Sequence, residues 1–161
     1  MGVYTFTIVD ETSPVAPHRL FMAMSIDNHN FMPMATPQSF KGAQLVEGDS
    51  TVVGAVKTFF SVEGAPFTYV TIKIDEIDAD NYYIKYTNTE SDFFGESIDR
   101  VVYDAKIDPV DSGSHYKLVA DFHTKGDIVV TYDDLKTILQ GMLLNYKGVV
   151  EYLCNNPEVY A

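Results

Sequence analysis

The sequence predicts one α+β domain in which an antiparallel sheet covers a long C-terminal helix. After Pro37, apolar and polar residues alternate with a period of two, in segments separated by Gly-, Asn- and Asp-containing turns. From about Tyr132 to Cys154, apolar residues recur instead at helical spacing. A length of 161 residues, 46% of them hydrophobic, suits a single core, so we expect residues 1–161 to form one domain.

The first element expected is a strand. Residues Val3 to Val9 place Tyr4, Phe6 and Ile8 on one side, with Thr5 and Thr7 on the other. This alternation is typical of a half-buried strand, which we expect to stop at Ser13-Pro14.

Two short helices are predicted next, between Val15 and Met34. The stretch carries several large apolar residues at spacings compatible with a helix, but Asp27-Asn28 interrupts the pattern. Pro33 and Pro37 are expected to end the second helix, since proline lacks the amide proton that a helix interior uses.

The region after Pro37 predicts about six strands in an antiparallel meander. Five turn signals delimit them, at Gly48-Asp49, residues 63–66, Asp80-Asn81, Gly95 and residues 111–114. Consecutive strands with short connections usually pair with their neighbours, so each strand is expected beside the next one in the chain.

The last element is the clearest. Thr131 is an N-cap candidate with Asp134 three residues later, and acidic residues favour the positive end of a helix. The apolar positions that follow are Leu135, Ile138, Met142, Tyr146, Val149 and Leu153. A helix of this length extends roughly 33 Å and must cross the whole sheet.

Charge and cysteine content disfavour several classes of function. A net charge of −12 without a basic run disfavours nucleic acid and anionic membranes as partners. The start of the chain has no secretion signal and no apolar run reaches membrane-spanning length, so we expect a cytoplasmic protein. Cys154 is the only cysteine and the four histidines are scattered, so neither a disulfide nor a metal or other cofactor is expected.

Several segments, taken in order, resemble one plant family. They are residues 13–17 with 19–21, Pro37-Gln38, Glu47-Gly48, residues 73–78, Tyr86-Thr87, residues 101–103, residues 123–127, residues 134–136, and Tyr152-Leu153 before Asn156-Pro157. On these segments the chain resembles, over its full length, the pathogenesis-related class 10 family, typified by the major birch pollen allergen. The resemblance implies a seven-stranded curved antiparallel sheet gripping the C-terminal helix, two short helices in a V, and a large internal hydrophobic cavity.

The resemblance also implies which side chains face that cavity. An aromatic stripe of period two is usually packed core, and only the family likeness favours a ligand site. Tyr69 and Tyr86 are expected to be its polar anchors and His29, placed between the short helices, to lie near its mouth. The predicted ligand-binding residues are Met24, His29, Met32, Phe59, Phe67, Tyr69, Ile84, Tyr86, Val101, Tyr116, Leu118, Ile138, Met142 and Tyr146.

The function that follows from the resemblance is defence-related carriage or storage of a small hydrophobic or phenolic plant metabolite. Flavonoids, cytokinins, steroids and alkaloid-like compounds are the implied ligand classes, and a monomer or weak dimer is expected. Two alternatives stay open: an enzyme of specialised metabolism working inside the cavity, and a defence protein whose ligand is incidental.

A ribonuclease activity proposed for the family is disfavoured in this chain. The resemblance assigns it to a lysine, a tyrosine and two glutamates, and Lys57 and Tyr152 match the first two. At the glutamate positions stand Asp99 and Val150, and valine cannot transfer a proton. The loop after Glu47 also keeps fewer glycines than the family pattern.

Overall fold

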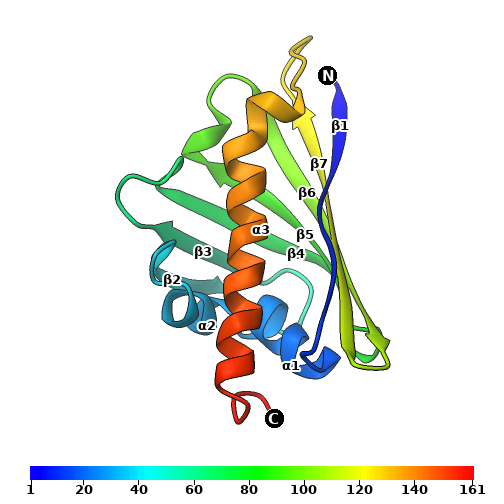
Figure 1. Ribbon diagram of the computed structural model, residues 1–161. Coiled ribbons are helices and arrows are strands. Elements are labelled where there is room, and N and C mark those ends of the chain that lie inside the picture. The colour runs from blue at the N-terminus through cyan, green and yellow to red at the C-terminus, as the bar shows by residue number, and fades with distance from the viewer.

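A single antiparallel sheet is the largest component of the computed structural model, which describes residues 1–161 (Figure 1). Its seven strands lie in the order β1-β7-β6-β5-β4-β3-β2, so the chain order is broken only where β1 joins β7. The strands are β1 (Val3–Ser13), β2 (Phe40–Glu47), β3 (Val56–Ser61), β4 (Tyr69–Asp78), β5 (Tyr83–Ser91), β6 (Ile98–Val110) and β7 (Gly113–Thr124).

The sheet is curved, and irregular pairing accompanies the curvature. The register shifts in four of the six strand pairs, including β1 with β7 between Thr7 and Val9. A bulge adds an unpaired residue to one strand, which bends that strand and increases its twist. In β1 the bulge also buries two consecutive residues, Ile8 and Val9, where strict alternation would expose one of them.

Short helices connect β1 to β2. They are α1 (Pro17–Phe21), a π-helical turn η1 (Met22–Ile26) and α2 (Asn28–Ala35), and the predicted interruption at Asp27 is present. The expectation that Pro33 ends the second helix is wrong, because Pro33 lies inside α2. The helix closes instead at Thr36, whose amide and hydroxyl both donate to the carbonyl of Met32. Two 3-10 turns, η2 (Ala79–Asn81) and η3 (Asp92–Phe94), join β4 to β5 and β5 to β6.

The long helix α3 (Tyr132–Asn155) lies across the concave face of the sheet (Figure 1). It begins as predicted, since the Thr131 hydroxyl accepts from the Asp134 amide and the Asp134 carboxylate accepts from the Thr131 amide at 2.8 Å. At its other end Arg19 of α1 donates to the carbonyls of Leu153, Asn156 and Val159 at 2.8–3.0 Å. These bonds join α1 to the last turn of α3 and to the residues that follow it.

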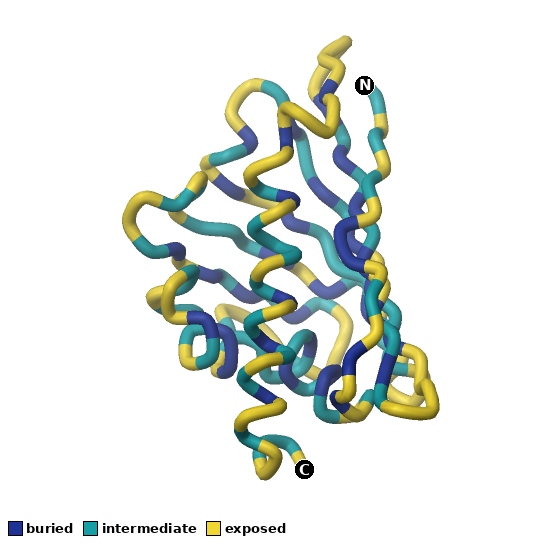
Figure 2. The backbone as a smooth tube through the Cα atoms, viewed as in Figure 1, coloured by how far each residue is buried: buried dark blue, intermediate teal, exposed yellow.

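The core occupies the space between the sheet and α3. Along the strands and the helix, buried positions alternate with exposed ones, and the buried faces meet (Figure 2). The predicted α+β architecture of seven antiparallel strands, a long C-terminal helix and short helices is therefore confirmed. None of the helices has the length and apolar character needed to cross a membrane.

Candidate functional site

An apolar pocket of about 140 Å³, here called the inner pocket, lies between the concave face of the sheet and α3. Sixteen of its 19 lining residues are hydrophobic. They are Val9, Met24, Asn28, Met32, Phe40, Phe59, Phe67, Val70, Ile72, Tyr86, Asn88, Phe93, Tyr103, Tyr116, Leu118, Ile138, Met142, Asn145 and Tyr146. The pocket is smaller than the large cavity that the family resemblance implied, because aromatic and methionine side chains fill the space around it.

Strand alternation delivers most of these side chains. Residues two apart face the same side of a sheet, so Tyr86 with Asn88 and Tyr116 with Leu118 enter the pocket together from β5 and β7. From α3, Ile138, Met142 and Tyr146 lie one above another at a spacing of four residues, which places them on one face of the helix. The pocket is therefore built from the regular parts of the fold.

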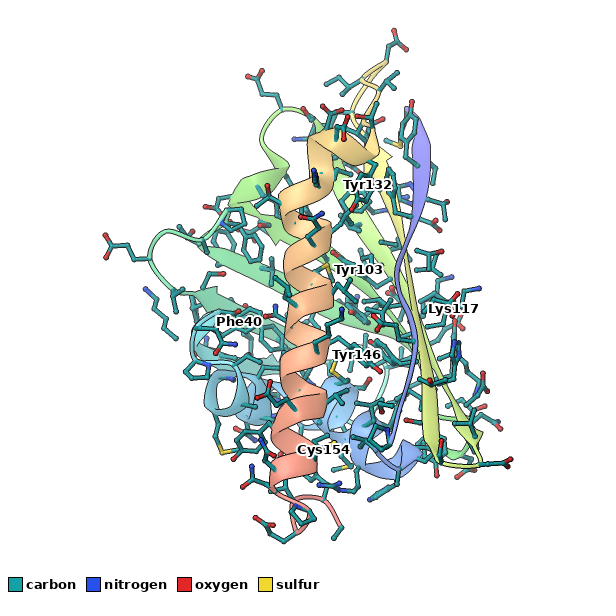
Figure 3. The ribbon with its side chains drawn as sticks, viewed as in Figure 1. Phe40, Tyr103, Lys117, Tyr132, Tyr146 and Cys154 are labelled. Atoms are coloured by element: carbon teal, nitrogen blue, oxygen red, sulfur yellow. The ribbon has the colours of Figure 1, made fainter.

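Four tyrosines form two stacked pairs in this pocket. The ring centroids of Tyr86 and Tyr103 are 5.0 Å apart, and those of Tyr116 and Tyr146 are 5.2 Å apart with planes inclined by only 7°. Figure 3 shows Tyr146 on α3 and Tyr103 behind the helix, on the sheet. The two pairs thus give the pocket flat, rigid walls suited to a planar molecule.

The tyrosine hydroxyls are poorly paired with the protein. The hydroxyl of Tyr103 donates only to the sulfur of Met142, at 3.8 Å, and the buried hydroxyl of Tyr146, although close to the side chain of Ser13, makes no hydrogen bond of normal geometry. Burial raises the pKa of Tyr86 and of Tyr116, and no hydrogen bond accompanies that burial. A buried hydroxyl without a partner costs about 1–3 kcal/mol, so an oxygen-bearing ligand that accepts from these groups would stabilise the protein.

Lys57 lies behind the end of the pocket that the short helices close. Its side chain has no exposed surface, and its ammonium donates to the carbonyls of Ser25 and Ile26 and, at 2.6 Å, to the side-chain oxygen of Asn28. Burial lowers the pKa of Lys57 to about 8, while the nearby carboxylate of Asp27 opposes that change. All three ammonium donors are used, and they hold Asn28 at the pocket wall.

Ten of the 14 predicted ligand-binding residues line the inner pocket. They are Met24, Met32, Phe59, Phe67, Tyr86, Tyr116, Leu118, Ile138, Met142 and Tyr146. Their contact with a ligand stays a prediction. The other four, His29, Tyr69, Ile84 and Val101, do not line it, and each has a separate reason.

Tyr69 lies on the opposite face of β4. Val70 and Ile72 face the pocket, so Tyr69 points away, and its hydroxyl donates to Glu90 at 2.7 Å. Phe67 and Tyr69 were both predicted to face the cavity, but Phe67 lies in the loop before β4, where the alternation of a strand does not hold. Tyr69 is therefore not one of the polar anchors of the pocket.

Ile84 and Val101 face the core but not the pocket. They are 3% and 0% exposed and belong to the packed core, so these two residues stabilise the fold and do not form part of the candidate ligand site. His29 does not lie between the short helices: it is in the first turn of α2, and its neighbour Asn28 reaches the pocket instead. Burial, with a smaller effect of Lys57, lowers the pKa of His29.

Nine lining residues were absent from the sequence prediction. They are Val9, Asn28, Phe40, Val70, Ile72, Asn88, Phe93, Tyr103 and Asn145. Tyr103 could have been found, since it alternates with Val101 on the same strand. Asn88 carried no such signal, because it is polar and polar residues are seldom buried. The residue is nonetheless only 2% exposed, and its side-chain nitrogen is placed to donate to the carbonyls of Thr71 and Glu90.

A second hollow of about 550 Å³, here called the outer pocket, adjoins the inner one. It lies between α3, the loop from β3 to β4 and the segment that enters β2. Five residues line both pockets, namely Phe40, Phe67, Ile138, Met142 and Asn145. Figure 3 shows Phe40 beside α3 on this side of the molecule. The two hollows are thus neighbours that share part of their lining, here called the shared rim.

The sequence matches a known protein family over most of its length. A family model described as the pathogenesis-related protein Bet v 1 family matches residues 3–152. The chain is 36% identical over 160 residues to the major allergen Mal d 1 of Malus domestica, covering 99% of each chain. It is 39% identical over 163 residues to the pathogenesis-related protein STH-21 of Solanum tuberosum, covering all of both.

Solved structures agree with this assignment. The crystal structure of Ara h 8.0201 superposes with a TM-score of 0.84 at 32% identity, covering 96% of this chain and 100% of the other. Norcoclaurine synthase from Thalictrum flavum, solved with dopamine and hydroxybenzaldehyde, gives a TM-score of 0.70 at 14% identity, covering 96% and 88% of the chains, a likeness of fold alone. From its sequence and its fold, the chain belongs to the pathogenesis-related protein Bet v 1 family.

Proposed function

We propose that this protein binds a small, ring-bearing plant metabolite in the inner pocket and carries or stores it. The observation that supports the proposal most is the pair of stacked tyrosine walls, whose hydroxyls lack good partners in the protein. Apolar pockets with a few polar groups are the usual form of small-molecule sites. A relative named as a pathogenesis-related protein, together with the family's name, favours a defence-related role.

The volume of the inner pocket narrows the ligand. An engineered apolar cavity of roughly 150 Å³ holds one benzene molecule, so 140 Å³ accommodates about one ring. A phenolic ring fits best, because it is planar and its oxygen can accept from the tyrosine hydroxyls. Multi-ring flavonoids or steroids would have to extend beyond the inner pocket.

Binding is favoured over catalysis by the ionisable groups present. The titratable side chains of the inner pocket are tyrosines, and burial raises the pKa of Tyr86, Tyr103 and Tyr116. Such phenols stay neutral near pH 7 and donate hydrogen bonds, but they do not serve as bases. The nearby amine of Lys57 is already engaged by three acceptors.

Native mass spectrometry tests this proposal. Wild-type protein is incubated with a plant phenolic extract and compared with Val70→Phe, which fills the inner pocket, and with Thr89→Phe, which adds the same ring on an exposed position of β5. We expect one compound retained at one per chain by the wild type and by Thr89→Phe, and lost in Val70→Phe. Retention of nothing, or equal retention in Val70→Phe, contradicts the proposal.

The same experiment distinguishes a carrier from an enzyme. A carrier releases the compound that was supplied, whereas release of a different compound identifies a catalyst. We place this activity in the cytosol, in a monomer or weak dimer, with neither nucleic acid nor membrane as partner. The net charge of −12 disfavours nucleic acid and anionic membranes as partners, and the exposed Leu144 on α3 supports weak self-association, which sedimentation at two salt concentrations measures.

A further inference from the structure

The outer pocket differs from the inner pocket in chemistry. Only seven of its 17 lining residues are hydrophobic, and the remainder include side-chain amides and hydroxyls from Gln38, Ser39, Ser61, Thr137 and Gln140. Glu63 is the only charged residue that lines it. A hollow lined by neutral donors and acceptors suits a neutral group that makes many hydrogen bonds.

The small volume of the inner pocket suggests that the ligand site also includes the outer pocket. The inner pocket holds about one ring, which is less than the roughly 300–1,000 Å³ of typical ligand sites, whereas the outer pocket of about 550 Å³ lies within that range. A ring that fills the inner pocket lies against Phe40, Phe67 and Met142 of the shared rim, and the outer pocket is the neighbouring space for the rest of a larger ligand.

Two features of α3 leave polar groups available there. Asn145 accepts from the Ser39 hydroxyl through its side-chain oxygen at 2.7 Å, which leaves its amide nitrogen to donate at the rim. Gly141, one turn earlier, has no side chain, and a Cβ built there meets no atom within 4 Å. No side chain therefore covers the helix backbone at Gly141, which lines the outer pocket together with Thr137 and Gln140.

We propose that the outer pocket binds a neutral, multiply hydroxylated group, so that the preferred ligand is a glycoside whose single aromatic ring occupies the inner pocket. The inference rests on the proposed function and extends it to a second subsite. Charged substituents are disfavoured: Glu63 and the net charge of −12 repel carboxylates, and one exposed carboxylate gives little attraction for a cation.

A set of three compounds tests the proposal by calorimetric titration. Phenol, phenyl β-glucoside and phenyl β-glucuronide share one ring and differ in the group that would reach the outer pocket. We expect the glucoside to bind wild-type protein at least about tenfold more tightly than phenol, from one or two added hydrogen bonds. The glucuronide, which has nearly the same shape with a carboxylate, should lose most of that gain.

Variants locate the effect. Gly141→Leu fills the outer pocket from a helix position that favours leucine over glycine, and it should abolish the advantage of the glucoside while changing phenol binding by less than about twofold. Gln140→Ala should weaken the glucoside by roughly 2- to 12-fold. Lys147→Leu adds the same side chain to an exposed part of α3 outside both pockets and should change neither affinity.

The outcomes separate the two proposals. If phenol and its glucoside bind equally, or if the glucoside advantage survives in Gly141→Leu, the outer subsite is refuted while the carrier function stands. If the glucuronide binds as tightly as the glucoside, the claim of a neutral group is wrong. If neither phenol nor the glucoside binds and the extract experiment also retains nothing, the proposed function itself is refuted.

Discussion

The buried ammonium of Lys57 makes a specific prediction about stability and pH. Its pKa in the folded protein is about 8, below the ordinary value of 10.5, because burial disfavours the charged form. Between these two pH values the unfolded chain therefore binds more protons than the folded chain. By linkage, the contribution of Lys57 to the free energy of unfolding rises as the pH rises through this window.

The expected magnitude is large enough to measure. The full difference between the two pKa values corresponds to about 3 kcal/mol, and the part gained between pH 7 and pH 9.5 is roughly 2 kcal/mol. Other groups titrate in the same range, and tyrosines with raised pKa act in the opposite direction above pH 10. Their effects cancel when wild type is compared with Lys57→Met, which has no titrating group at this position.

Urea unfolding at several pH values between 7 and 9.5 gives the free energy of unfolding of both proteins. We expect the wild type to gain roughly 2 kcal/mol relative to Lys57→Met across that range. A difference that stays constant with pH would show that the pKa of Lys57 is ordinary. Should Lys57→Met not fold, an NMR titration of the Lys57 side chain in wild type decides the matter, since a midpoint near pH 10.5 contradicts the reasoning.

Three further predictions concern the frame that holds the pockets, each measured by thermal or urea unfolding. Gly141→Ala should raise the free energy of unfolding by about 0.5–1 kcal/mol, because the added Cβ meets no other atom. Gly113→Ala should instead destabilise the protein strongly, because the added Cβ would lie 2.0 Å from the carbonyl oxygen of Ser13. Equal effects of the two substitutions would rule out this account. Arg19→Met should cost about 3 kcal/mol, since three carbonyls in and just after the last turn of α3 lose a charged donor, and a change below about 0.5 kcal/mol would mean that water replaces it fully. Thr131→Ala should cost about 1 kcal/mol through the lost N-cap, and Thr131→Ser should restore most of it, a rescue whose failure would contradict the capping role.

Sequence patterns predicted the fold because its elements are locally marked. The capping box at Thr131 and Asp134 fixed the start of α3, and turn residues such as Gly48 and Gly113 separated the strands. The expected end of the second helix at Pro33 was wrong, because hydrogen bonds further along the chain compensate for the proline. Pro33 sits inside α2, where the bonds of Thr36 to Met32 let the helix continue past a missing amide proton.

The inner pocket was harder to predict than the fold, because facing the core and lining the pocket are different properties. Ile84 and Tyr86 share one face of β5, yet only Tyr86 reaches the pocket. The bulge in β1 brought Val9 to the pocket side, and the strand start at Tyr69 reversed its expected direction. Such shifts of one residue depend on pairing with distant strands, which a single sequence does not encode locally.

The partner of β1 has a consequence for how the chain folds. Val3 pairs with His123 and Ser13 with Ser114, so the first strand synthesised gains a neighbour only after the last strand has been made. A pairing between residues so far apart slows folding, because the long segment between them must close before the contact stabilises the fold. Until β7 exists, β1 presents an unpaired edge with Tyr4, Phe6 and Ile8 uncovered, and during that interval the growing chain is most exposed to aggregation.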